Sequence, residues 1–107
     1  MSVVINVDTP LCDHSHKIET EKRGDKVKID IDTTCDRVEN ASDLTVTTED
    51  ILGRSKNDLY SKLNRFLEEQ CFVLPAVITA CRLEAGLISK RLAKKTNEIE
   101  IKFEEVK

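Results

Sequence analysis

Residues 70–81 read QCFVLPAVITAC, the most apolar run of the chain, and they hold two of its four cysteines. Pro75 suits the first turn of a helix, where its missing N–H leaves no hydrogen bond unmade. From there the apolar residues step by three and four, which is typical of a helix with one face toward a core. This stripe consists of Ile78, Cys81, Ala85, Ile88 and Leu92. We therefore expect one helix here, with Cys71 just before it and Cys81 on its buried face.

Alternation of apolar and polar residues predicts strands at both ends of the chain. Residues 2–7 form the first such stretch, and residues 26–32 alternate without a fault. A turn signal at residues 23–25 separates the latter from a preceding strand, so residues 16–32 are expected to form an antiparallel hairpin. A last strand is expected after the polar break at residues 94–97, with Ile99, Ile101 and Phe103 on one face.

Three helical segments are expected between the hairpin and residue 70. The first begins after Thr33 or Thr34, either of which can cap it, and this start places Cys35 in the first turn. The second is a single turn at residues 48–53 that is closed by glycine. The third starts at a capping-box-like sequence in residues 55–58. The inward positions are Val38, Ala41 and Leu44 in the first segment and Leu59, Leu63, Phe66 and Leu67 in the third.

Strands precede helices in this order, which predicts an α+β fold. We expect an antiparallel or mixed sheet of three to four strands with the helices packed on one face. The last strand should return to the same sheet, because a strand alone is unstable. A chain of 107 residues is expected to form a single domain, residues 1–107.

The composition excludes several functional classes. A net charge of −3 argues against binding the phosphate backbone of nucleic acids. No run of 18 apolar residues is present to span a membrane, and the first residues lack the pattern of a signal peptide. A cytoplasmic location is expected. There, four cysteines indicate metal binding or redox chemistry rather than structural disulfides.

The candidate ligands are the four cysteines and both histidines. In an extended segment Cys12, His14 and His16 share one face, and zinc and iron accept thiolate and imidazole together. Cys35 at a strand-to-helix junction lies where the helix dipole favours a thiolate. Cys71 and Cys81 flank the start of the later helix, although Cys81 alone is also typical of a small buried core residue.

Several of these segments resemble a known family. Leu74-Pro75-x-Val77-x-x-x-Cys81, the Gly-Asp at residues 24–25 and Cys35 after that strand are similar to motifs of NifU/IscU-type iron–sulfur cluster assembly scaffolds. Arg23 stands where that family has its first ligand cysteine, so the resemblance implies that Cys12 would have to replace this ligand from the neighbouring strand. The chain also resembles small prokaryotic domains with Cys-x-His near the start. The scaffold resemblance implies a related fold and an iron–sulfur cluster.

The sequence leads to two functional hypotheses. The first is a small cytosolic metal-binding protein, a scaffold or carrier for an iron–sulfur cluster or a zinc protein, with protein partners. Its ligand pool is Cys12, His14, His16, Cys35, Cys71 and Cys81. The alternative is a metal-free interaction module or homodimeric subunit with its cysteines in the core. No signature of a cysteine hydrolase or a phosphate-binding loop is present, so an enzyme is not expected.

Overall fold

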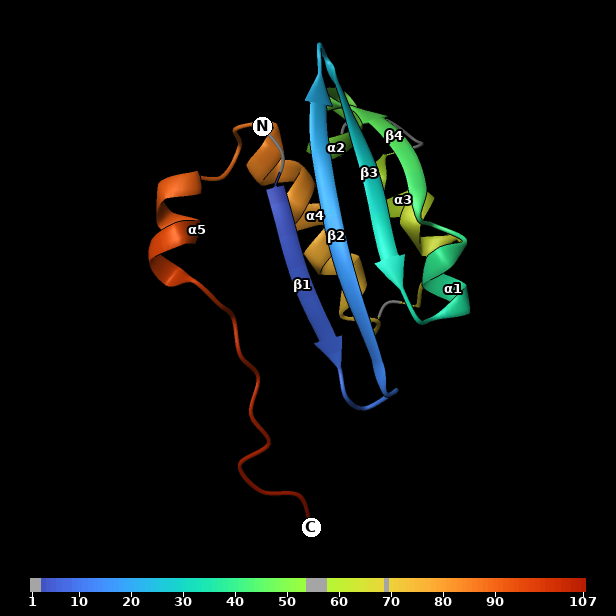
Figure 1. Ribbon diagram of the computed structural model, residues 1–107, viewed down its shortest axis with the longest axis vertical. Helices are drawn as coiled ribbons and strands as arrows, with labels where there is room; N and C mark the ends of the chain where they lie inside the picture. Colours follow the sequence, from blue (N-terminus) through green and yellow to red (C-terminus); the bar gives the residue numbers. More distant parts are fainter. Residues whose placement is uncertain (1–2, 54–57, 69) are drawn as a thin grey trace.

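The computed structural model describes residues 3–53, 58–68 and 70–107 (Figure 1). Its strands are β1 (Val3–Thr9), β2 (His14–Arg23), β3 (Lys26–Thr33) and β4 (Asp43–Thr47). They form one antiparallel sheet in the order β1-β2-β3-β4. The α+β class and the antiparallel sheet are as predicted. The two outer strands, β1 and β4, are the edges of the sheet.

The hairpin of β2 and β3 is the centre of the sheet and confirms the alternation pattern. Ile29 and Ile31 on β3 are buried together with Ile18 on β2, and the residues between them point to the polar face. Ile18 pairs directly with Ile31 across the two strands. Gly24 makes the tight turn with a φ of +66°, a region that residues with a Cβ seldom adopt. One face of the sheet is thereby apolar and must be covered.

Helices cover that face. They are α1 (Asp36–Glu39), α2 (Thr48–Leu52), α3 (Leu59–Asn64) and α4 (Val73–Glu84), whereas α5 (Lys90–Thr96) lies to one side of the sheet. Figure 1 shows α2, α3 and α4 on the same side of the sheet, and α4 packs against β1, β2 and β3. Pro75 lies in the first turn of α4, as predicted. In the described part of the chain, no helix has the length and apolarity to cross a membrane.

The prediction of a helix after Thr33 or Thr34 that extends to Leu44 is wrong beyond the first turn. α1 ends at Glu39, and Leu44 belongs to β4, where it pairs with Ile29. Residues 43–47 alternate polar and apolar with two threonines and a valine, which suits an edge strand. Val46 is buried by this pairing. The free hydrogen-bonding edge of β3 therefore overrides the short helical pattern.

The short helices α2 and α3 follow their capping signals. Thr47 and Asp50 form a capping box at α2, and Gly53 closes that helix with a φ of +75°. Asp58 caps α3 by accepting a hydrogen bond from the Ser61 N–H at 2.8 Å. The rest of the predicted capping sequence, residues 55–57, lies outside the described residues.

Phe66 was predicted to point into the core, and this prediction is wrong because α3 ends before Phe66. The helix stops at Asn64, so the three-four spacing is lost beyond Leu63. Leu59, Leu63 and Leu67 are buried, whereas Phe66 is 40% exposed.

The single helix expected from Pro75 to Leu92 is two helices. α4 ends at Glu84, and Gly86 follows with a φ of +79°, which turns the chain away. The buried face of α4 runs through Val77, Ala80 and Cys81. α5 buries none of its side chains.

The predicted last strand is not formed in this structure. Residues 97–107 have no regular secondary structure, and their apolar side chains are exposed. A strand requires backbone hydrogen bonds to a neighbour. Among the described residues this segment has no such neighbour.

Substitutions of Leu63 in α3 and of Phe66 just after it should distinguish a core position from a surface position. Leu63 is fully buried, so Leu63→Ala is expected to lower the free energy of unfolding by about 2–5 kcal/mol. Phe66→Ala removes a larger side chain from an exposed position and should cost less than about 1 kcal/mol. Urea denaturation of both variants measures the difference. An equal loss in the two variants would contradict the assignment of Phe66 to the surface.

Candidate functional site

Cys12 lies in the turn between β1 and β2. The prediction that it shares a strand face with His14 and His16 is therefore wrong. Residues 10–13 form this turn, in which Asp13 has a φ of +58° and the Cys12 N–H donates to the Thr9 carbonyl at 3.1 Å. The Cys12 side chain is exposed, and its thiol donates to Thr9 Oγ1 at 3.0 Å. The turn thus brings the thiol back to the end of β1.

Thr9 belongs to a hydrogen-bonded network across three strands. Its hydroxyl donates to the His14 carbonyl at 3.1 Å, which leaves Thr9 Oγ1 to accept from His16 Nε2 at 3.0 Å. His16 Nδ1 then accepts from the Thr33 hydroxyl at 2.7 Å. Thr33 Oγ1 in turn accepts the backbone N–H of Cys35 at 3.0 Å. Every polar atom of the buried His16 ring is therefore satisfied in the neutral form.

His16 is held neutral by its surroundings. Only 4% of the residue is exposed. Burial lowers the pKa of His16 below its ordinary value of 6.5, the nearby His14 lowers it further, and Asp8 offsets part of this shift. Because both ring nitrogens already have partners, metal binding by His16 requires the loss of one hydrogen bond. Its place in the structure is that of a positioning residue for the two cysteine-bearing segments.

His14 lies on the same strand but at the rim of the sheet. Its Nδ1 is 2.9 Å from Thr34 Oγ1, which also accepts the Ser15 N–H. The two imidazole rings are 6.4 Å apart between centroids. In residues 3–53, 58–68 and 70–107 no partner is found for His14 Nε2, so this nitrogen is the one available to a ligand.

Cys35 is the N-cap residue of α1 rather than a residue of its first turn, which corrects the expected caps Thr33 and Thr34. Its backbone is extended, and its side chain makes no capping hydrogen bond. The thiol is half-buried. The guanidinium of Arg37 lies within electrostatic range of it.

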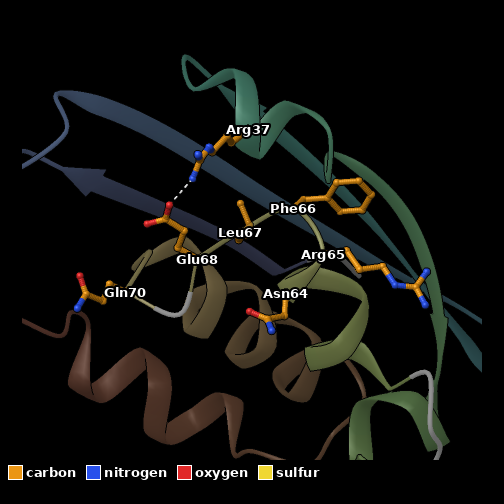
Figure 2. Close-up of a pocket in the computed structure, with 7 residues that line it drawn as sticks. All are labelled: Arg37, Asn64, Arg65, Phe66, Leu67, Glu68 and Gln70. Carbon is orange, nitrogen blue, oxygen red and sulfur yellow. Dashed lines mark hydrogen bonds and ion pairs between the residues drawn. The ribbon is translucent and has the colours of Figure 1, made fainter.

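Cys71 precedes α4 and is connected to the Cys35 segment through an ion pair. The Cys71 N–H donates to the Glu68 carbonyl at 3.0 Å. The Glu68 carboxylate binds Arg37 of α1, and the hydrogen bond and charge of Glu68 raise the pKa of Arg37. Figure 2 shows these two side chains facing each other at an open groove. The groove is lined by Arg37, Asn64, Arg65, Phe66, Leu67, Glu68 and Gln70.

Cys81 is a member of the hydrophobic core itself. It is 0% exposed on the face of α4 that packs on the sheet. Burial, and then the charge of Glu84, raises the pKa of Cys81 to about 12. A metal ligand must be a thiolate, and this environment disfavours that form. Cys81 is therefore better interpreted as a core residue than as a ligand.

Sequence reasoning missed three polar residues that organise the interior: Thr9, Thr33 and Glu84. Both oxygens of the buried Glu84 carboxylate accept hydrogen bonds, from the Thr20 hydroxyl at 3.2 Å and from the Lys22 N–H at 3.3 Å. Glu84 follows Val77, Ala80 and Cys81 at helical spacing, and that register could have revealed its burial. No local signal identifies the two threonines.

The structure brings Cys12, His16 and Cys35 into one network and places Cys71 at the segment tied to α1. All four cysteines are free thiols. Among the described residues no group of three or more His, Cys, Asp or Glu is already arranged to hold a metal ion.

Protonation of His16 should destabilise the fold at mildly acidic pH. The unfolded imidazole binds a proton near 6.5, whereas the folded one requires a lower pH, so the unfolded state holds more protons between these values. The contribution of neutral His16 to the free energy of unfolding is therefore fully present above pH 6.5. It is lost as the pH falls through the lowered pKa of His16. Urea denaturation of the parent chain should show this loss between pH 7.5 and pH 5.5.

His16→Gln should reduce that pH dependence. His14→Gln is the matched control and should keep most of it, because burial is the larger cause of the His16 shift. The assignment fails if His16→Gln keeps the full dependence.

Comparison with known proteins yields one family. No curated protein and no solved structure is significantly similar to the chain. Residues 3–96, which include every strand and helix described above, match the model of a family of unknown function, DUF6951. The chain belongs to the DUF6951 family.

Proposed function

We propose that this chain binds a soft metal ion or an iron–sulfur cluster through Cys12, Cys35 and Cys71, and that it acts as a cluster scaffold or carrier, or as a zinc protein. The observation that carries the proposal is that these three free thiols all lie on turns or helix starts. Cys12 is exposed, and the other two are half-buried. Thiolates are the preferred ligands of iron–sulfur clusters and of zinc.

The three cysteine-bearing segments lie toward one end of the sheet. In Figure 1 the β1–β2 turn, the junction of β3 with α1 and the start of α4 are all in the lower half of the domain. The network through His16 links the first two segments, and the Arg37–Glu68 ion pair links the second to the third. The proposal requires these segments to move until the thiols meet, so that ligand binding and local ordering would be one event.

The fourth ligand decides the kind of site. His14 Nε2 or the Asp13 carboxylate, both beside Cys12 in sequence, can complete a closed tetrahedral shell, which is typical of structural zinc. A shell of three thiolates leaves one position open and suits a cluster that is bound transiently. The resemblance to NifU/IscU scaffolds suggests the second arrangement, and membership of DUF6951 leaves both in place.

A cytoplasmic location belongs to the same proposal. Four free thiols in a chain of 107 residues suit a reducing compartment, where cysteines serve as ligands more often than as disulfides. A metal-free interaction module is the alternative function. The observation that favours it is the exposed apolar side chains of the C-terminal segment.

Metal and acid-labile sulfide content of anaerobically purified protein tests the proposal. Cys12→Ser, Cys35→Ser and Cys71→Ser should each lower metal affinity by at least about tenfold, because each removes a thiolate ligand. Cys81→Ala should leave the metal content unchanged, since its thiol lies in the core.

The element found separates the two kinds of site. Iron with sulfide supports the cluster, and about one equivalent of zinc supports the closed site. The proposal is wrong if the three serine variants retain the parent's metal content, or if the parent binds neither iron nor zinc.

A further inference from the structure

The last segment of the chain has the pattern of a strand but lies apart from the sheet. Ile99, Ile101 and Phe103 are 87%, 67% and 68% exposed, and charged residues stand between them. In the described part of the chain no hydrogen bond or ion pair joins residues 99–107 to the rest; the ion pairs Lys102–Glu100 and Lys107–Glu105 are internal to the segment. Such regular alternation is typical of a strand with one face covered, and it is not expected of a solvated tail.

The sheet has a free edge of matching length. β1 pairs only with β2, so the backbone groups along its other edge lack a partner strand within the described residues. β1 spans seven residues, the length of the alternating stretch 98–104. Such an edge is a template for strand addition.

The side chains of β1 fit such an addition. Val3, Ile5 and Val7 face the helices and are only half-buried, so this outermost apolar row is incompletely covered. A strand added to β1 places its own apolar row beside these three residues and its charged row on the polar face of the sheet.

We propose that residues 98–104 of one copy of this chain add to β1 of a second copy, and the reverse, to give a strand-exchanged dimer. The arm that carries the segment supports exchange rather than closure onto the chain's own edge. α5 buries none of its side chains, and Asn97 with a φ of +69° ends that helix. Figure 1 shows α5 and the following residues extending to one side of the domain and then beyond it. A twofold exchange pairs the free β1 edge of each copy with the C-terminal segment of the other.

The dimer is independent of the proposed metal site. Its contacts lie on the β1 edge and the C-terminal arm, whereas the thiols are in the β1–β2 turn and at the starts of α1 and α4. Failure of metal binding therefore leaves this inference intact, and the reverse also holds.

Sedimentation equilibrium of the full chain, with and without a chelator, tests the proposal. A dimer is expected in both conditions. Ile101→Asp places a charge in the apolar row and should raise the dimer dissociation constant by at least about tenfold. Lys102→Asp introduces the same group one residue later, in the charged row, and should remain dimeric. Both variants should keep the parent's circular dichroism, because residues 99–107 contribute nothing to the core.

Hydrogen exchange identifies the strand that is covered. In the dimer, amides of β1 and of residues 99–103 should be protected, and this protection should disappear on dilution to monomer. A monomer with both segments unprotected overturns the proposal. A monomer with both protected overturns it as well, because it shows strand addition within one chain. Open-ended oligomers, or equal dissociation of both aspartate variants, likewise overturn it.

Discussion

The packing of α4 on the sheet is the contact on which the rest of the structure depends. The sheet offers one apolar face, centred on Ile18 and Ile29, and α4 is the longest helix available to cover it. Val77 and the small Ala80 are both fully buried at this contact. Each buried Val or Ile contributes roughly 1.5–3 kcal/mol relative to exposure, so a few such residues equal the whole net stability of a small domain.

Glu84 connects this apolar contact to the edge geometry of the sheet. β1 begins by pairing Val3 with Thr20, so β2 continues beyond the described start of its neighbour. The Lys22 N–H donates to the Glu84 carboxylate at 3.3 Å. The second carboxylate oxygen accepts from the buried Thr20 hydroxyl. One carboxylate on α4 thus satisfies two donors of β2.

Elements with strong local patterns were predictable, and elements decided by neighbours were not. The β2–β3 hairpin follows from alternation and a glycine turn, both of which act over a few residues. β4 forms because β3 has an open edge beside residues 43–47, and this edge is visible only in the fold. The same limit applies to α4: its helical spacing was evident, but the fully buried residue is Val77, whereas the predicted Ile78 is only partly buried.

For the candidate site, residue types were predictable and their environments were not. His14 and His16 share a strand face and differ by two positions, yet only His16 is enclosed between Thr9 and Thr33. Cys35 and Cys81 likewise have the same chemistry, and packing alone makes one half-buried and the other fully buried. A ligand set depends on distances between separate elements, which local sequence does not encode.

The C-terminal segment shows the same separation between pattern and partner. Ile99, Ile101 and Phe103 satisfy the periodicity of a half-buried strand as well as Val27, Ile29 and Ile31 do. The latter have neighbours on both sides, whereas the former have none among the described residues. Alternation therefore states which face of a segment needs cover, and the hydrogen-bonding edge that receives it must come from elsewhere. In this chain the β1 edge and the unpaired segment are complementary, and the extended arm favours a partner outside the chain itself.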